Sequence, residues 1–249
     1  MKVLLSGCGG AMGRMLAEII AEKNEMSVCA GVDKFPPSNA AFPVFNEYSS
    51  CDIECDAIID FSHPSALTSL LKYAMDKSLP IVLCTTGLSD AQQEEIIEAS
   101  KKIAIFKSAN MSLGVNLMTD LLQKAASFLN GFDIEIIEKH HNKKLDAPSG
   151  TALMLADSIN EALEDKKEYK YGRHGADAKR QPQEIGIHAV RGGTIVGEHQ
   201  VHFIGPDEII EIRHTALSKR VFAVGAVQAA VFIKDKSPGM YDMQDMLED

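Results

Sequence analysis

The sequence is poor in positive charge and has no long hydrophobic run. Its 25 Lys and Arg residues are outnumbered by 35 Asp and Glu residues, so the formal net charge is -10. Because binding to a nucleic-acid backbone depends on clustered positive charge, nucleic acid is not an expected partner. The longest nearly apolar stretch, Val221 to Ile233, contains Gln228 and is shorter than the roughly 20 residues that cross a bilayer. It predicts a buried helix, and no membrane partner is expected.

Cysteine is scarce and unevenly placed. All five cysteines lie in the first third of the chain, and their spacing matches neither a disulfide framework nor paired zinc ligands. Cys51 and Cys55 come closest to a metal-binding pair, but the sequence around them offers no histidine or second cysteine pair. We therefore expect no metal and a reducing, cytoplasmic setting. The opening MKVLLSG is too short an apolar run for a signal peptide and is typical of a first strand.

Proline is infrequent, and repeats and low-complexity segments are absent. With 9 prolines, 24% charged residues and 45% hydrophobic residues, the composition argues against extended disorder. A chain of 249 residues can bury one large core or two modest ones. The sequence therefore predicts a globular protein of one or two domains.

Short apolar runs alternate with amphipathic segments through the first hundred residues. Strands that alternate with helices of this length predict βαβ units and a parallel sheet, as in nucleotide-binding α/β domains. The predicted strands are VLLSG, VCAGVD, AIIDF, IVLCTT and IAIF, and the predicted helices run from Met12 to Lys23, after Pro64 and through Ala99.

The pattern changes after Asn110. A long helix is predicted from Met111 to Leu129, and a polar loop from Glu164 to Gln183. These segments predict an α+β domain with a large mixed or antiparallel sheet. Its other expected elements are a strand in FDIEIIEKHH, a helix after Ser149 and strands in EIGIHAV, TIVGEHQVHFIG and EIIEIRHTA.

The last predicted helix, Lys219 to Lys234, could pack back on the first domain and make that domain discontinuous. The expected division is therefore a dinucleotide-binding domain of residues 1–110 and 219–249. Residues 111–218 would then form the second domain.

A glycine-rich turn follows the first predicted strand, where Gly7-Cys8-Gly9-Gly10-Ala11-Met12-Gly13-Arg14 leads into a helix. Glycines permit a tight turn, let a pyrophosphate approach backbone N–H groups and allow the helix to pack closely on the strand. The helix N-terminus adds partial positive charge. Met12 stands where the third glycine of G-x-G-x-x-G would fall, so an ordinary structural turn remains an alternative.

The second predicted strand ends at Asp33, where a carboxylate can accept hydrogen bonds from adenosine ribose hydroxyls. Asp33 should repel a 2′-phosphate, whereas the next residue, Lys34, could attract one. The pair predicts NADH with some tolerance for NADPH, and an exposed turn with two charges is the alternative. Thr85-Thr86-Gly87 and Ser108-Ala109-Asn110 follow later strands, at the edge where parallel sheets bind ligands, and are candidates for the nicotinamide side.

The segment EKHHNKKLDAPSGTA concentrates positive charge in an otherwise acidic chain. A predicted strand delivers His140 and His141 to its end, where alternation sends their side chains to opposite faces. Lys143 and Lys144 follow in a turn. Histidine exchanges protons near neutral pH, and a lysine beside other cations can have a lowered pKa and act as an acid.

A helix is expected to begin directly after this turn, with Ser149 as its cap. The first N–H groups of that helix, from Gly150 and Thr151, would suit a carboxylate. Together with the lysines they predict an anion site. A solvated basic turn before an ordinary capped helix is the alternative.

Two glycine-containing segments, Arg191-Gly192-Gly193 and Gly197-Glu198-His199, interrupt the later strand pattern. They suggest a loop that approaches a ligand or a subunit. His188, His202 and His214 lie in strand-like runs and are expected to be structural.

The chain carries, in this order, the segments GCGGAMGR, IDFSHP, CTTG, SANMSLGVN, EKHHNKKLDAPSGTA, RGGTIVGEH and MYDMQDMLED. Through these motifs it resembles the 4-hydroxy-tetrahydrodipicolinate reductase family, also called dihydrodipicolinate reductase, along nearly its whole length. The family's fold implies a Rossmann-type α/β cofactor domain and an α+β substrate domain whose large mixed sheet also builds a homotetramer. Its activity implies reduction of 4-hydroxy-tetrahydrodipicolinate to tetrahydrodipicolinate by NAD(P)H in lysine and diaminopimelate biosynthesis.

Matching positions carry the family's roles. His140 corresponds to the catalytic acid/base and Lys144 to the proton donor, while His141, Lys144, Gly150 and Thr151 match positions that hold substrate carboxylates. Members that favour NADPH tend to carry arginine beside the acidic residue, so Lys34 leaves the preference open. The positions implicated in cofactor binding are Gly7, Cys8, Gly9, Gly10, Ala11, Met12, Asp33, Lys34, Cys84, Thr85, Thr86, Ser108, Ala109, Asn110 and Met111.

Two other functions remain open at this point. Another two-domain NAD(P)-dependent oxidoreductase, acting on a sugar or a semialdehyde, would keep the glycine turn and a lysine but would not need HH-x-x-K before PSGT. A non-catalytic nucleotide sensor would have no reason to keep the acid/base groups of the second domain.

Overall fold

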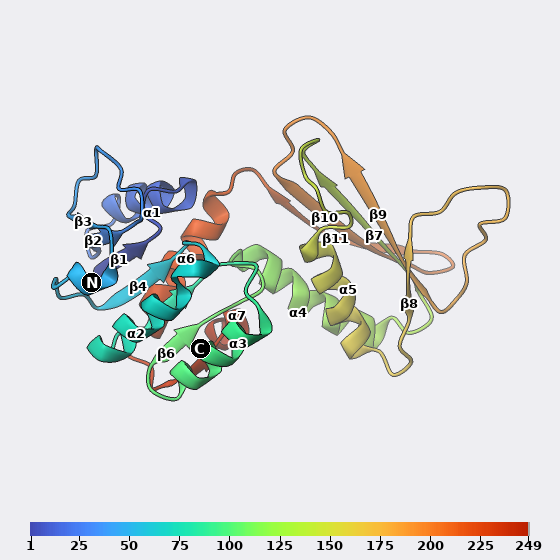
Figure 1. Cartoon of the computed structure of the whole chain (residues 1–249). Coiled ribbons are helices and arrows are strands. Elements are labelled where there is room, and N and C mark those ends of the chain that lie inside the picture. The colour runs from blue at the N-terminus through green and yellow to red at the C-terminus, as the bar shows by residue number, and fades with distance from the viewer. Residues whose placement is uncertain (249) are drawn as a thin grey trace. The chain divides into compact units, whose positions relative to one another are not determined.

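A computed structural model of the chain describes residues 1–248 (Figure 1). Its contacts divide the chain into two compact units. One unit comprises Met1–Met111 together with Arg220–Asp249, and the other comprises Ser112–Lys219. The C-terminal segment therefore returns to the N-terminal unit.

The first unit is built on a seven-stranded sheet in which every neighbouring pair of strands is parallel. The strand order β12-β6-β5-β4-β1-β2-β3 contains the 3-2-1-4-5-6 order of a Rossmann fold, extended at one edge by β12. The predicted Rossmann-type sheet is thus confirmed. The strands are β1 (Lys2–Ser6), β2 (Ser27–Val32), β3 (Val44–Phe45), β4 (Ala57–Asp60), β5 (Ile81–Leu83), β6 (Ala104–Phe106) and β12 (Gly239–Tyr241).

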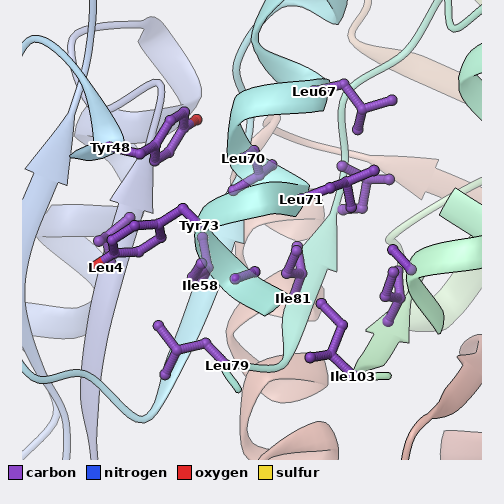
Figure 2. Packing of buried hydrophobic residues seen from close by; sticks show 14 of the residues in the cluster. Leu4, Tyr48, Ile58, Leu67, Leu70, Leu71, Tyr73, Leu79, Ile81 and Ile103 are labelled. Carbon is purple, nitrogen blue, oxygen red and sulfur yellow. The ribbon is translucent and has the colours of Figure 1, made fainter. Parts of the chain in front are cut away.

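Helices pack against this sheet through apolar faces. In α2, Leu67, Leu70 and Leu71 recur at helical spacing, and Figure 2 shows them beside Ile58 of β4 and Ile81 of β5 in one buried cluster. Burial of each such side chain contributes about 1.5–3 kcal/mol. The helical segments are α1 (Ala11–Ala21), η1 (Tyr48–Ser50), η2 (Pro64–Ala66), α2 (Leu67–Lys77), α3 (Asp90–Ser100), α6 (Arg220–Ile233) and α7 (Met243–Glu248).

Helix α6 accounts for the longest apolar stretch of the sequence. It packs against α1 and against strands β4, β5 and β6. Gly225 makes the close approach possible, because a Cβ there would lie 1.7 Å from the carbonyl oxygen of Met111.

The second unit contains a five-stranded mixed sheet of order β11-β10-β7-β9-β8. The β7–β9 and β8–β9 pairs are parallel, and the β10–β7 and β10–β11 pairs are antiparallel. One prediction was wrong: the loop expected from Glu164 to Gln183 contains β8, a four-residue edge strand of sequence EYKY in which only Tyr169 is not exposed. The strands are β7 (Asp133–His140), β8 (Glu168–Tyr171), β9 (Glu184–Arg191), β10 (Gly197–Ile204) and β11 (Ile209–Ala216).

Helices α4 (Leu113–Phe128) and α5 (Gly150–Ala162) pack together and cover one face of this sheet (Figure 1). Along β7, alternate residues are buried against them, beginning with Ile134 and Ile136 and continuing with Glu138 and His140. The apolar core under the helices therefore gives way, near the end of β7, to a buried polar cluster on the same face.

Candidate active site

The glycine turn after β1 is shaped by close backbone packing. Gly7 has φ +76°, and a Cβ there would lie 2.6 Å from the carbonyl oxygen of Phe61; a Cβ on Gly13 would lie 2.3 Å from the carbonyl oxygen of Gly7. Helix α1 begins at Ala11, and Gly10 precedes it without a capping side chain. The first N–H groups of α1 are therefore open to an external anion, which fits the pyrophosphate of a dinucleotide.

Asp33 directly follows β2 and holds the glycine turn. Its carboxylate oxygens accept hydrogen bonds from the N–H groups of Gly9 and Phe35, each at 2.8 Å. Each oxygen of a carboxylate can accept a second hydrogen bond, so capacity for ribose hydroxyls remains. Lys34 is exposed, and its ammonium lies 5.9 Å from the centre of the Phe35 ring.

A buried acid that the sequence analysis did not single out supports the neighbouring turns. Asp60, at the end of β4, accepts hydrogen bonds from the Ser6 hydroxyl, from the Thr85 hydroxyl at 2.6 Å and from the Ser62 N–H at 3.2 Å. Burial raises the pKa of Asp60, and these hydrogen bonds offset part of the effect. Thr85 is thus committed to Asp60, whereas Thr86 is exposed. The sequence did contain a signal for Asp60, because a carboxylate at the end of the apolar run AIID lies at the end of a predicted strand.

The segments expected to bind the cofactor follow β1, β2, β5 and β6. These strands run parallel within one sheet, so their carboxyl ends lie along one edge, where such sheets bind ligands. Burial also raises the pKa of the Cys84 thiol. Ser108 donates to the carbonyl oxygen of Asn110 at 3.2 Å, and the buried Met111 packs its carbonyl against α6.

One pocket of about 570 Å³ lies at the opposite edge of this sheet. Its walls come from residues before β1, β4 and β5, at the amino ends of the strands. It is therefore separate from the glycine turn. The lining residues are Met1, Lys2, Ile53, Glu54, Cys55, Asp56, Tyr73, Lys77 and Leu79.

In the second unit, Glu138 is the centre of the polar cluster at the end of β7. Its side chain is fully buried. One oxygen lies 2.7 Å from Nδ1 of His140, and the other accepts from the N–H of Ser149 at 3.0 Å. Arg191 of β9 donates to both oxygens at 2.7 Å. Burial alone would raise the pKa of Glu138, but hydrogen bonds from Arg191, His140 and Ser149 outweigh it, so the carboxylate has a lowered pKa.

His199 of β10 closes the cluster from the neighbouring strand. The Ser149 hydroxyl accepts from the N–H of Ala152 at 3.2 Å and lies 2.9 Å from Nε2 of His199. The rings of His140 and His199 meet edge to face, 5.2 Å apart. Burial, helped by His140, lowers the pKa of His199 to about 4. His199 is therefore neutral at neutral pH.

His214 of β11 also contacts a helix-capping serine, at the start of α4. Its Nε2 lies 3.5 Å from the hydroxyl of Ser112, which caps α4 by accepting from the N–H of Val115. Burial lowers the pKa of His214. His199 and His214 thus each connect the sheet to a serine that caps a helix, which agrees with the structural role expected for His214.

Lys144 lies in the loop between β7 and α5, and its ammonium is 2.8 Å from a carboxylate oxygen of Asp146. Lys144 holds the pKa of Asp146 below its usual range, and the Gly150 N–H acts in the same direction. An internal carboxylate therefore already lies between the lysine and the start of α5, at the predicted anion site. His141 and Thr151 nearby are half-buried.

No cluster of residues suited to hold a metal ion occurs within residues 1–248. The same part of the chain contains no helix that is long and apolar enough to cross a membrane.

Comparison with known proteins places the chain in a family. Two sequence models, described as the N-terminus and the C-terminus of dihydrodipicolinate reductase, match residues 1–111 and 114–247. The chain belongs to the dihydrodipicolinate reductase family. This family assignment agrees with the resemblance seen in the sequence motifs.

Similar members include the 4-hydroxy-tetrahydrodipicolinate reductases of Clostridium tetani and Caldanaerobacter subterraneus subsp. tengcongensis. The first is 53% identical, over 99% of this chain and 96% of its own length. The second is 51% identical, over 99% of this chain and 98% of its own length. Among solved structures, a dipicolinate-bound dihydrodipicolinate reductase from Paenisporosarcina sp. TG-14 matches with TM-score 0.83 at 25% identity, over 99% of both chains. A myo-inositol dehydrogenase from Lactobacillus casei matches at TM-score 0.58 and 17% identity, over 98% and 90%, and shares the fold alone.

Proposed function

We propose that the chain reduces 4-hydroxy-tetrahydrodipicolinate to tetrahydrodipicolinate with NAD(P)H, in lysine and diaminopimelate biosynthesis. The observation that supports this most strongly is the cluster around Glu138 and His140, next to Lys144 at the start of α5. The chain is a pyridine-nucleotide-dependent reductase by family. A sugar dehydrogenase such as the inositol enzymes shares its fold but has no need for a cationic loop built for a dicarboxylate.

The residues of the first unit fit a dinucleotide. The glycine turn and the uncapped start of α1 would hold the pyrophosphate, and Asp33 would accept from the adenosine ribose. The segments Cys84–Thr86 and Ser108–Met111 would line the nicotinamide side. When bound, the nicotinamide supplies a hydride. Because Asp33 disfavours a 2′-phosphate and Lys34 favours one, we infer a modest preference for NADH.

The residues of the second unit would bind and protonate the substrate. Lys144, His141 and the first N–H groups of α5, from Gly150 and Thr151, would hold the two carboxylates of the ring. In the free chain Asp146 neutralises Lys144, so a substrate carboxylate would take its place. Preorganised positive charge would stabilise negative charge that develops on the ring. Lys144 or His140 would then deliver the proton.

We also propose a homotetramer in the cytoplasm, with the second unit as the oligomerisation domain. The mixed sheet of this unit leaves large apolar side chains exposed, among them Val190, Ile209 and Ile210. The five cysteines are free thiols, as a reducing compartment would leave them. Analytical ultracentrifugation should give four times the 27.1 kDa chain mass, and a monomer would contradict the assembly.

The function is tested with purified protein, NADH or NADPH, and freshly generated 4-hydroxy-tetrahydrodipicolinate. We expect the absorbance of the reduced nicotinamide to fall only when substrate is present, with a higher kcat/KM for NADH. No turnover of this substrate, combined with turnover of a sugar or an aldehyde, would contradict the proposal.

A further inference from the structure

The contacts of Glu138 go beyond what an anion-binding loop requires. Its carboxylate joins its own strand, the neighbouring strand β9 and the residue that caps α5, through His140, Arg191 and Ser149. It is completely buried, so each of these contacts replaces water that the carboxylate has lost. An ionised carboxylate is an acceptor only, and the lowered pKa of Glu138 keeps it ionised.

The 2.7 Å contact with Nδ1 therefore determines which nitrogen of His140 carries a proton. Nδ1 must donate, so in the neutral ring Nε2 is the unprotonated nitrogen. We propose that Glu138 is the positioning residue that fixes His140 in the Nδ1–H tautomer, so that Nε2 is the nitrogen that exchanges the proton in the reaction. This proposal rests on the proposed function.

A second observation concerns the space around Nε2. Gly197 is the first residue of β10, next to Glu198, which pairs with Lys139 of β7, and a Cβ on Gly197 would lie 3.1 Å from Nε2 of His140 and 3.5 Å from its Cδ2. Any other residue at this position would crowd the ring. The glycine that interrupts the strand pattern therefore leaves space beside the outer nitrogen of His140 that a side chain would fill.

The same carboxylate links the histidine to the start of α5. Glu138 accepts from the Ser149 N–H, and Ser149 in turn caps the helix whose first N–H groups belong to Gly150 and Thr151. Arg191 extends the link, because it also donates to the carbonyl oxygen of Asp146 at 2.7 Å. The ring and the helix start are therefore held by one buried anchor.

Several charged or titratable groups surround His140. Glu138 lies on the same strand, Arg191 comes from β9 and His199, which burial keeps neutral, comes from β10. Lys144 and Asp146, in the loop before α5, neutralise each other. Among these groups Glu138 is the one whose carboxylate contacts the imidazole directly.

The decisive variant is Glu138→Gln. An amide has one acceptor oxygen, which the Arg191 and Ser149 donors would claim, so its NH₂ group would face Nδ1 and donate to it. His140 would then switch to the Nε2–H tautomer. An acid-to-amide change of this kind in a serine-protease triad lowers kcat by about 10⁴ through the wrong tautomer. Here we expect a fall of at least roughly a hundredfold in kcat with little change in KM, and a pH profile shifted toward acid.

Two further variants separate positioning from general structural damage. Glu138→Asp keeps an acceptor-only side chain, so it should retain the Nδ1–H tautomer and recover much of the activity. Glu135→Gln alters a carboxylate on the same strand that faces the other side of the sheet and binds Arg173, Arg180 and His188. It should lower stability and leave the pH profile of kcat unchanged.

The tautomer is read without any substrate, by NMR of the full chain labelled with 15N-histidine. An Nδ1–H signal for His140 in the native chain and an Nε2–H signal in Glu138→Gln are expected. An Nε2–H tautomer in the native chain overturns the proposal, as does a Glu138→Gln enzyme with native kcat and pH profile. If neither Glu138 variant folds, the tautomer of the native chain alone decides. Absence of turnover by the native enzyme would instead count against the proposed function.

Discussion

Strand β7 carries two carboxylates, one on each face of the mixed sheet, and each contacts a histidine. Glu138 is fully buried, whereas Glu135 is half-buried. On the face covered by α4 and α5, Glu138 contacts Nδ1 of His140, the nitrogen nearer the backbone. On the other face, Glu135 contacts Nε2 of His188, the outer nitrogen. Both distances are 2.7 Å. The first arrangement leaves the outer nitrogen available for chemistry, whereas the second uses it for structure.

The arginines differ in the same way. Glu138 has one arginine, Arg191, which binds it through both terminal nitrogens. Glu135 has two, Arg173 and Arg180, which come from the chain between β8 and β9. The buried carboxylate of Glu138 supports a histidine through Nδ1, whereas the half-buried Glu135 joins the segment between β8 and β9 to the sheet. Similar residue types therefore serve different purposes according to which atoms meet.

The largest expected effect is on the helix-covered face. Lys144→Ala removes the proposed proton donor and carboxylate ligand, so turnover should fall by about 10²–10⁴-fold. Steady-state kinetics measure this loss, and fluorescence of bound NADH should show nearly unchanged cofactor affinity. Lys143→Ala, at the exposed neighbouring position, is the matched control and should retain native turnover. A mild loss in Lys144→Ala would reduce that residue to a binding role.

Removal of one arginine should destabilise the chain more at Glu138, which has a single arginine partner, than at Glu135, which has two. Arg191→Met leaves Glu138 buried with no cation, which should destabilise the chain by about 3 kcal/mol. Arg173→Met leaves Glu135 with Arg180 and His188, so a loss of about 1 kcal/mol is expected. Urea unfolding followed by circular dichroism measures both losses. Equal losses would remove the distinction between the two clusters.

The neutral histidine beside the cluster predicts acid sensitivity. His199 has a pKa of about 4 when folded, against 6.5 for an ordinary histidine, so between these pH values only the unfolded chain takes up the proton. Stability should therefore be unaffected above pH 6.5 and fall by about 3 kcal/mol as the pH drops to 4. His199→Gln keeps an acceptor for Ser149 but does not titrate, so it should flatten this part of the pH curve. An unchanged slope would contradict the assignment.

The smallest effect is expected in the first unit, where the proposed site is made largely of backbone N–H groups. Asp33→Ala should weaken NADH binding by roughly tenfold and NADPH binding less, because one charged hydrogen-bond acceptor is lost. Lys34→Ala is the opposite control and should weaken NADPH binding more. Isothermal titration gives both affinities. The reverse ordering would overturn the cofactor preference.

The parallel sheet was predictable because each of its main strands is an apolar run between amphipathic helices. Strand β3 has two residues, and the three residues of β12 are not buried, unlike those of the equally short β5 and β6, so neither stands out as a buried apolar run. Strand β8 has four residues and lies at an edge, and only its Tyr169 packs against the core. Short and edge elements are defined by their partners rather than by their own sequence.

The candidate site shows the same limit. The motif from Glu138 to Ala152 indicated the histidines, the lysine and the capping serine, since these are close in sequence. Arg191 and His199 join them from other strands, more than 50 residues from Glu138. Alternation along β7 predicts that Glu138 and His140 share a face. Only the pairing of β7 with β9 and β10 brings Arg191 and His199 to that face.

Titration of dipicolinate, an aromatic dicarboxylate, into the 15N-histidine-labelled chain tests most directly whether the helix-covered face binds the substrate. NMR follows the signal of each histidine. Binding at the proposed site should shift the signals of His140 and His141 and leave those of His188 and His202 in place. A shift confined to His188 or His202, with His140 unchanged, would contradict the assignment of the helix-covered face as the substrate site.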